Sequence, residues 1–190
     1  MFIFVVAASL AVAWLRGGRL ERLTDFPFRH VWLIFAAFTI QFFLHLPTVG
    51  ALPLAHKAAP YLYSSAYYLL LVCFALNRRA PGVVWLAAGT LANLTVITAN
   101  GGKMPVDGEK LVALGCAGVR DYFTAGLSLT HRLITPETRL PWLGDVLVGS
   151  PPFPNPTLFS AGDLLLAIGV FVLVQGIMVG RALSTAGETG

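Results

Sequence analysis

Two aspartates, Asp145 and Asp163, are the residues whose type and spacing could carry chemistry in this chain. Asp145 lies in a stretch rich in glycine and proline, and Asp163 stands at the beginning of an apolar stretch. When two carboxyl groups lie close together, one can stay ionised and accept a proton from water while the other, protonated, donates to a carbonyl oxygen. The pair is therefore a candidate aspartyl dyad, formed by a loop that folds back over a helix end.

A structural role accounts for the same two residues. Ser160 can cap the last helix with Asp163 at its third position, where a carboxylate is favoured by the positive end of the helix. Asp145 can then be a solvated loop residue. From the residues alone, catalysis and helix capping both stay open.

A second group of polar residues could bind a substrate or ligand near the same ends of the helices. Polar side chains are costly in a bilayer and therefore tend to face the protein interior, where they serve either a site or hydrogen bonding between helices. The turn NGGKMP at 100–105 is typical of a helix C-terminus, and its amides and lysine could alternatively bind an anionic group. The residues of this group are Gln41, His45, Asn93, Asn100 and Lys103.

The chain contains no motif for a cofactor or a metal. Its two cysteines, Cys73 and Cys116, have neither a metal-binding spacing nor a disulfide framework, and we interpret them as structural thiols. Glycine-rich nucleotide loops and the common hydrolase motifs are also missing from the sequence. We therefore expect no metal and no cofactor, and whether the protein is an enzyme stays open.

The composition indicates an integral membrane protein. Hydrophobic residues make up 56% of the 190 residues and charged residues 12%, which is too little charge for the surface of a soluble globule. The net charge of +4 does not indicate nucleic-acid binding, because the basic residues lie mainly between apolar blocks. Membrane lipids are the expected partners, with other membrane subunits as a further option.

We expect an all-α fold in one membrane domain, 1–190, with about five transmembrane helices. Arginines after the first and third spans place those loops in the cytoplasm, so the N-terminus lies outside and the C-terminus inside a bacterial inner membrane. The outer segment, 101–162, should contain an amphipathic helix near 109–114, while 121–134 could be a strand or an interfacial piece. The spans are expected at about 1–15, 31–46, 61–76, 82–99 and 163–180.

Four motifs together carry a resemblance that covers nearly the whole chain. They are WLRGGRLERL, ANGGKMPV, HRLITPETRLPWLGD and FSAGDLLLAIGV. This pattern resembles a family of small bacterial polytopic membrane proteins known only as a domain of unknown function. The resemblance implies the architecture and no activity.

A shorter stretch, FPNPTLFSAGDLLLAIGVFVLV, is similar to the last-helix motif of lipoprotein signal peptidase, also called signal peptidase II. That resemblance implies that Asp163 and Asp145 are the catalytic pair. GTLANL is similar to another motif of that family and would match Asn93 to its conserved asparagine. The chain lacks the arginine that follows this asparagine in the peptidase, and Ser160 replaces the asparagine of the last-helix motif.

Two functional hypotheses follow. The first is a non-catalytic membrane subunit or lipid- and small-ligand-binding module with an outward-facing polar site. The alternative is an aspartyl intramembrane hydrolase that resembles lipoprotein signal peptidase, with Asn93 orienting the substrate.

Overall fold

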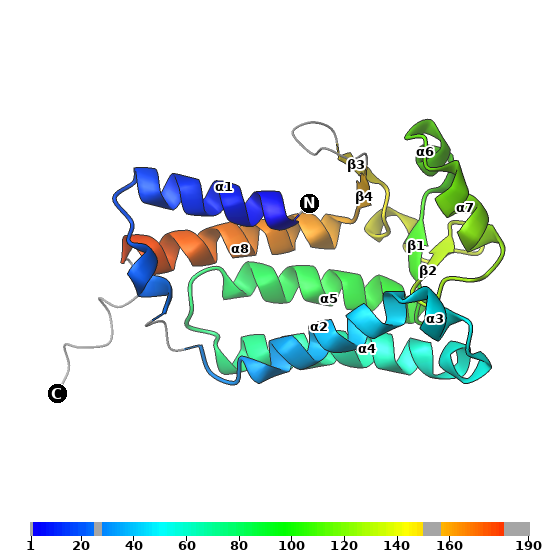
Figure 1. Ribbon diagram of the computed structural model, residues 1–190, viewed down its shortest axis with the longest axis horizontal. Helices are drawn as coiled ribbons and strands as arrows, with labels where there is room; N and C mark the ends of the chain where they lie inside the picture. The colour runs from blue at the N-terminus through cyan, green and yellow to red at the C-terminus, as the bar shows by residue number, and fades with distance from the viewer. Residues whose placement is uncertain (1, 25–27, 150–156, 181–190) are drawn as a thin grey trace.

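The computed structural model describes residues 2–24, 28–149 and 157–180. Five long helices run side by side along the length of the molecule (Figure 1). Met1 of the expected first span, residues 150–156 of the expected outer segment, and residues 181–190 lie outside the described ranges. The long helices are α1 (Phe2–Leu15), α2 (Trp32–His45), α4 (Pro53–Leu76), α5 (Val83–Ala99) and α8 (Ala161–Val179).

Helices occupy all five positions where the sequence predicts an apolar span, and one of them begins much earlier than expected. The third was predicted to begin near residue 61, but α4 begins at Pro53. Proline suits the first position of a helix, because its missing N–H would have no partner there. Pro60, inside the helix, does not end it.

Two of the long helices, α4 and α8, are long and apolar enough to cross a membrane. The other three are apolar but shorter. With 17 residues, α5 spans about 26 Å, slightly less than the roughly 30 Å of a bilayer core.

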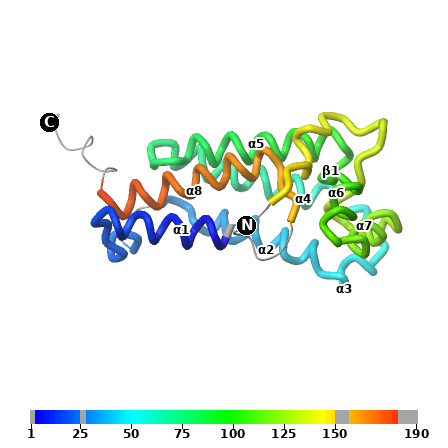
Figure 2. The backbone as a smooth tube through the Cα atoms, turned by 90° about the horizontal axis from the view of Figure 1, so that it is seen from above, coloured from blue at the N-terminus to red at the C-terminus, as the bar shows by residue number. Residues whose placement is uncertain are grey.

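The helices pack in a row. In this row α2 packs on α4, α4 on α5, α5 on α8, and α8 on α1 (Figures 1 and 2). The first and last helices of the chain are therefore neighbours, and α8 lies between α1 and α5. This arrangement lets side chains from all five helices face a common space.

Glycines allow α5 and α8 to approach each other closely. Gly82 and Gly89 on the α5 side lie against the backbone of α8 at Gly169 and Gly162. A Cβ atom added to Gly169 would lie 2.7 Å from Cγ of Leu86 and 2.8 Å from its backbone nitrogen. The contact has no room for a methyl group, so it fixes how the two helices meet.

The residues between α5 and α8 form a cap at one end of the bundle (Figure 1). Within the described ranges this cap contains four short strands. The fold is therefore mainly helical, and the prediction of an all-α fold is only partly correct. The predicted amphipathic helix near 109–114 is confirmed, and the undecided piece 121–134 contains the end of a helix and then a strand. The cap elements are β1 (Met104–Val106), α6 (Gly108–Ala113), α7 (Ala117–Thr124), β2 (His131–Leu133), a 3₁₀ turn (Pro141–Leu143), β3 (Leu147–Gly149) and β4 (Thr157–Phe159).

Strand pairing connects distant parts of this cap. Strand β1 pairs in parallel with β2, and β3 pairs antiparallel with β4. On its other side, β1 forms a parallel bridge from Val106 to Asp145. Two short helical pieces complete the chain elsewhere, η1 (Leu20–Leu23) and α3 (Pro47–Gly50).

A side-chain clasp ties the cap to the end of α5. The amide nitrogen of Asn100 donates to the Arg139 carbonyl oxygen at 2.8 Å, and the Arg139 N–H donates to the Asn100 amide oxygen at 2.9 Å. Gly102, at φ +82°, packs its backbone directly on Pro60 of α4. A residue with a side chain would be strained at that φ and would collide with the proline.

We expect Gly169→Ala to destabilise the protein, because the added methyl group must push α5 away from α8. Overpacking of this kind costs about 1–3 kcal/mol. Thermal unfolding in detergent would measure the loss. Gly118→Ala is the matched control, because no atom lies within 4 Å of the added Cβ. Equal melting temperatures for the two variants would show that the α5–α8 contact is not tight.

Candidate functional site

Asp163 caps its own helix, as one of the two sequence interpretations predicted. Its backbone N–H donates to the Ser160 hydroxyl oxygen at 3.0 Å, and its Oδ2 accepts from the Ser160 backbone N–H at 3.2 Å. This reciprocal pair is a capping box. One carboxylate oxygen of Asp163 is therefore engaged at the first turn of α8.

The second carboxylate oxygen of Asp163 binds across to α5. The buried Asn93 donates from its amide nitrogen to Asp163 Oδ1 at 2.9 Å, and its amide oxygen accepts from the Ser160 hydroxyl at 2.8 Å. Gly162 makes this possible, because a Cβ atom there would overlap the Asn93 side chain. The sequence placed Asn93 and Asp163 in one site, and they are in direct contact.

Asp145 is positioned by main-chain pairing with β1. Its N–H donates to the Pro105 carbonyl oxygen at 2.8 Å, and its carbonyl oxygen accepts from the Asp107 N–H at 3.2 Å. The Asp145 side chain is only 13% exposed. Burial, together with the nearby charge of Asp163, raises the pKa of Asp145 from 3.8 to about 8. This pKa favours the protonated carboxyl group at neutral pH, and the burial of the side chain does not fit the alternative of a solvated loop residue.

His131, which sequence reasoning missed, contacts Asp145. Its Nε2 lies 3.7 Å from Asp145 Oδ2. Burial, with smaller effects from His45 and Lys103, lowers the pKa of His131 to about 4. Since both groups are uncharged at neutral pH, this contact is not an ion pair.

An apolar cavity of about 410 Å³ lies among the five long helices, and Asp163 lines it. Its other polar lining groups are Gln41, Tyr67 and Asn93. Apolar side chains from every long helix and the α1–α2 connection form the rest of the wall. They are Val6, Phe28, Ile34, Phe38, Leu70, Phe74, Leu86, Leu166, Val170 and Leu173.

Three of the expected ligand-binding residues lie outside this cavity. Asn100 is occupied in the clasp to the cap. The Lys103 ammonium donates to the Ser128 carbonyl oxygen at 2.6 Å, and burial lowers its pKa. His45 is exposed at the end of α2 and does not line the cavity. Polar residues at the ends of these helices thus serve mainly to hold the cap.

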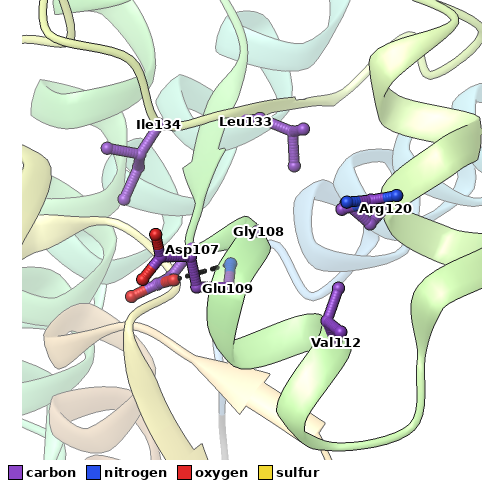
Figure 3. A pocket seen from close by; sticks show the side chains of 7 residues that line it. All are labelled: Asp107, Gly108, Glu109, Val112, Arg120, Leu133 and Ile134. Carbon is purple, nitrogen blue, oxygen red and sulfur yellow. Dashed lines mark hydrogen bonds between the residues drawn. The ribbon is translucent and has the colours of Figure 1, made fainter.

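A second pocket, of about 660 Å³, lies within the cap (Figure 3). Figure 3 shows Asp107 and Glu109 close together, with Arg120 on the other side. Two of its charged groups already have partners: Asp107 pairs with Lys110, and Arg120 pairs with Asp121. The cavity among the long helices is therefore the stronger candidate site.

Comparison with known proteins assigns the chain to a protein family. The model of a family of unknown function, DUF5317, matches residues 25–175. The chain belongs to the DUF5317 family. This DUF5317 chain is 26% identical over 170 residues to an uncharacterized protein of Thermotoga maritima, covering 90% of this chain and 86% of that protein. No solved structure matches the chain.

The described part of the chain brings no group of three or more His, Cys, Asp or Glu side chains into a metal-binding arrangement. In this DUF5317 protein, Asp163 lines the apolar cavity and is hydrogen-bonded to Asn93 and Ser160, while Asp145 is buried in the cap.

We expect the pH dependence of stability to reveal the buried proton of Asp145. The unfolded chain releases this proton near pH 3.8 and the folded chain near pH 8, so between these values the folded state binds more protons. Its stability should fall as pH rises through this window, by about 1.4 kcal/mol per pH unit. Asp145→Asn cannot titrate and should lack this part of the slope. Thermal unfolding of both proteins from pH 4 to 9 measures the difference, and parallel curves would contradict the raised pKa.

Proposed function

We propose that this DUF5317 protein is an integral membrane protein that binds a lipid-like ligand in the cavity among its five long helices. The cavity carries the proposal, because its volume of about 410 Å³ lies within the usual range of small-molecule sites. Its wall is apolar except for a few polar groups. Such a lining suits an amphiphile with an apolar body and a hydrogen-bonding end.

The polar lining groups differ in what they can offer a ligand. Asn93 and Asp163 already bind each other. The side-chain amide of Gln41 makes no hydrogen bond within the described ranges, so its donor and acceptor are both available. We propose that Gln41 binds the polar end of the ligand, beside the Asn93–Asp163 pair.

The surface of the helices supports a lipid environment. Large apolar side chains on α2 are strongly exposed, with Phe35 at 68%, Phe38 at 58% and Phe42 at 63%. A soluble protein rarely exposes such a band, whereas a lipid-facing helix requires it. We propose that all five long helices span a bilayer core, although three of them are short.

The ends of the bundle support one orientation of the protein in the membrane. Arg16 donates to the Gln175 side chain and Arg22 to the Met178 carbonyl, each at 2.9 Å, so the first-loop arginines lie at the C-terminal end of α8. Arg78 and Arg79 follow α4 at this same end (Figure 1). By the positive-inside rule this end is cytoplasmic, and the cap and the site face outward in a bacterial inner membrane.

We expect a reporter fused after Arg79 to remain cytoplasmic and the same reporter inserted at Asp121 to be exported. Alkaline phosphatase, which is active only after export, provides the readout for both fusions. The opposite pattern would put the cap and the site on the cytoplasmic side.

We expect Val170→Trp to weaken lipid binding at least about tenfold, which corresponds to about 1.4 kcal/mol, because the larger side chain fills the cavity. Native mass spectrometry of the detergent-solubilised protein with added phosphatidylglycerol would measure the bound fraction. Leu164→Trp is the control, because Leu164 lies on the same helix, is 48% exposed and does not line the cavity. Equal binding by both variants would argue against the cavity as the lipid site.

A second candidate function is an aspartyl hydrolase that acts on a membrane-bound substrate. The raised pKa of Asp145 favours it, because the pair then holds one proton on Asp145 while Asp163 accepts hydrogen bonds at both oxygens. Asp163 would accept a proton from water as the water oxygen bonds to the substrate carbonyl carbon. Asp145 would donate its proton to the carbonyl oxygen. The resemblance to lipoprotein signal peptidase points to the same pair.

If the protein hydrolyses its ligand, Asp145→Asn should lower turnover by at least about 100-fold, the usual contribution of a general acid. The assay would follow release of a fluorophore from a lipid-modified peptide by purified protein in nanodiscs. Glu109→Gln, which removes an exposed carboxylate in the other pocket, should keep full activity. Lipid binding without turnover in the wild-type protein would leave the non-catalytic function standing.

A further inference from the structure

Two histidines and a threonine form a chain of contacts from Asp145 to the C-terminal end of α2. His131 Nε2 lies 3.7 Å from Asp145 Oδ2, and His131 Nδ1 lies 2.8 Å from the Thr130 hydroxyl oxygen. That hydroxyl lies 3.4 Å from His45 Nε2, and His45 Nδ1 lies 2.7 Å from the Gln41 carbonyl oxygen. Asp145 and Thr130 are shielded from solvent, whereas His45 is exposed.

The Gln41 carbonyl fixes the direction of this chain. A carbonyl oxygen can only accept a hydrogen bond, so His45 Nδ1 must carry a proton and, in the neutral ring, Nε2 is an acceptor. The Thr130 hydroxyl is the donor that faces this nitrogen. We assign its single proton to the contact with His45 Nε2, so the hydroxyl oxygen accepts from His131 Nδ1. His131 then presents an unprotonated Nε2 to Asp145.

We propose that His131, Thr130 and His45 form a proton path that connects the buried carboxyl group of Asp145 with the last residue of α2, His45, at the cap end of the bundle. This inference rests on the proposed function, because it describes how the acid at that site exchanges protons once ligand fills the cavity. His131 acts through Asp145 and is therefore a positioning residue.

Each step along the path breaks one bond to hydrogen and forms another. The Asp145 proton moves from oxygen to His131 Nε2, which must first approach by roughly 1 Å to reach hydrogen-bonding distance. The Nδ1 proton of His131 moves to the Thr130 oxygen, and the Thr130 proton moves to His45 Nε2. The result is an Asp145 carboxylate and a protonated His45, which can release its extra proton to water.

The groups around the path keep its middle uncharged. Lys103 and His45 both disfavour a positive charge on His131, and Phe123 stacks on its ring at 5.6 Å between centroids. Asp163 on α8 and Tyr63 and Tyr67 on α4 also interact electrostatically with Asp145. A proton is therefore not held at His131, which suits an intermediate carrier.

Nitrogen NMR of the full-length protein labelled with ¹⁵N-histidine in detergent micelles tests the path, because the two ring nitrogens differ in chemical shift when only one is protonated. At neutral pH and without ligand, we expect both His45 and His131 to carry their proton on Nδ1. Assignment uses His45→Gln and His131→Gln, since the chain has four histidines. In Thr130→Val the His131 proton should move to Nε2, whereas Thr130→Ser should keep it on Nδ1.

A His131 proton on Nε2 in the wild-type protein would overturn the proposal, because the chain would then point toward Asp145. An unchanged His131 spectrum in Thr130→Val, with an unchanged melting temperature, would overturn it as well. Both results are independent of lipid binding: a protein that binds no phosphatidylglycerol but shows the expected protonation of both rings would refute the proposed function and leave the path intact.

Discussion

The close contact between α5 and α8 is the constraint on which the site depends. Glycines on both helices remove the side chains that would separate them, so backbone meets backbone along this contact. Asn93 can then reach both Ser160 and Asp163 at the first turn of α8. A wider separation would leave the buried amide of Asn93 without partners, at a cost of about 1–3 kcal/mol. The polar contacts of the site therefore depend on the close packing of α5 and α8.

The cap supplies the other half of the site by a different means. It places Asp145 through main-chain pairing with β1, and β1 follows directly from the end of α5. The side chain that results is shielded from water, and this burial, with the charge of Asp163, raises its pKa. A short irregular segment can produce such an environment because two backbone hydrogen bonds, to Pro105 and from Asp107, fix it along one edge of β1.

Part of this structure could be predicted from residue types and spacing. Apolar blocks located the long helices, Ser160 followed by Asp163 indicated a capping box, and the polar positions near the helix ends pointed to Asn93 and Gln41. The spacing of Gly162, Gly169 and Gly176 along α8 was a readable signal for close packing. Helical periodicity is local, so it can be recognised without knowledge of the fold.

Other features have no local signal. His131 belongs to the site because β2 pairs with β1, and two three-residue strands far apart in sequence do not identify each other. Asn100 and Lys103 look like ligand-binding residues by type, but backbone carbonyls of the cap occupy them. The buried state of Asp145 depends on the whole assembly of cap and bundle. Sequence patterns identify helices and strands, whereas the roles of these residues depend on how the helices and strands pack together.

Because the helices pack in a row, the cavity wall has two parts, one that carries the acids and one that does not. Asn93 lies on α5 and binds Asp163 across the glycine contact between α5 and α8. Asp145 is held by β1, which follows α5 in the chain. The opposite wall comes from α1 and α2, which stand at the two ends of the row. The positions of these two end helices therefore affect the width of the cavity, whereas α5 and β1 position the acids.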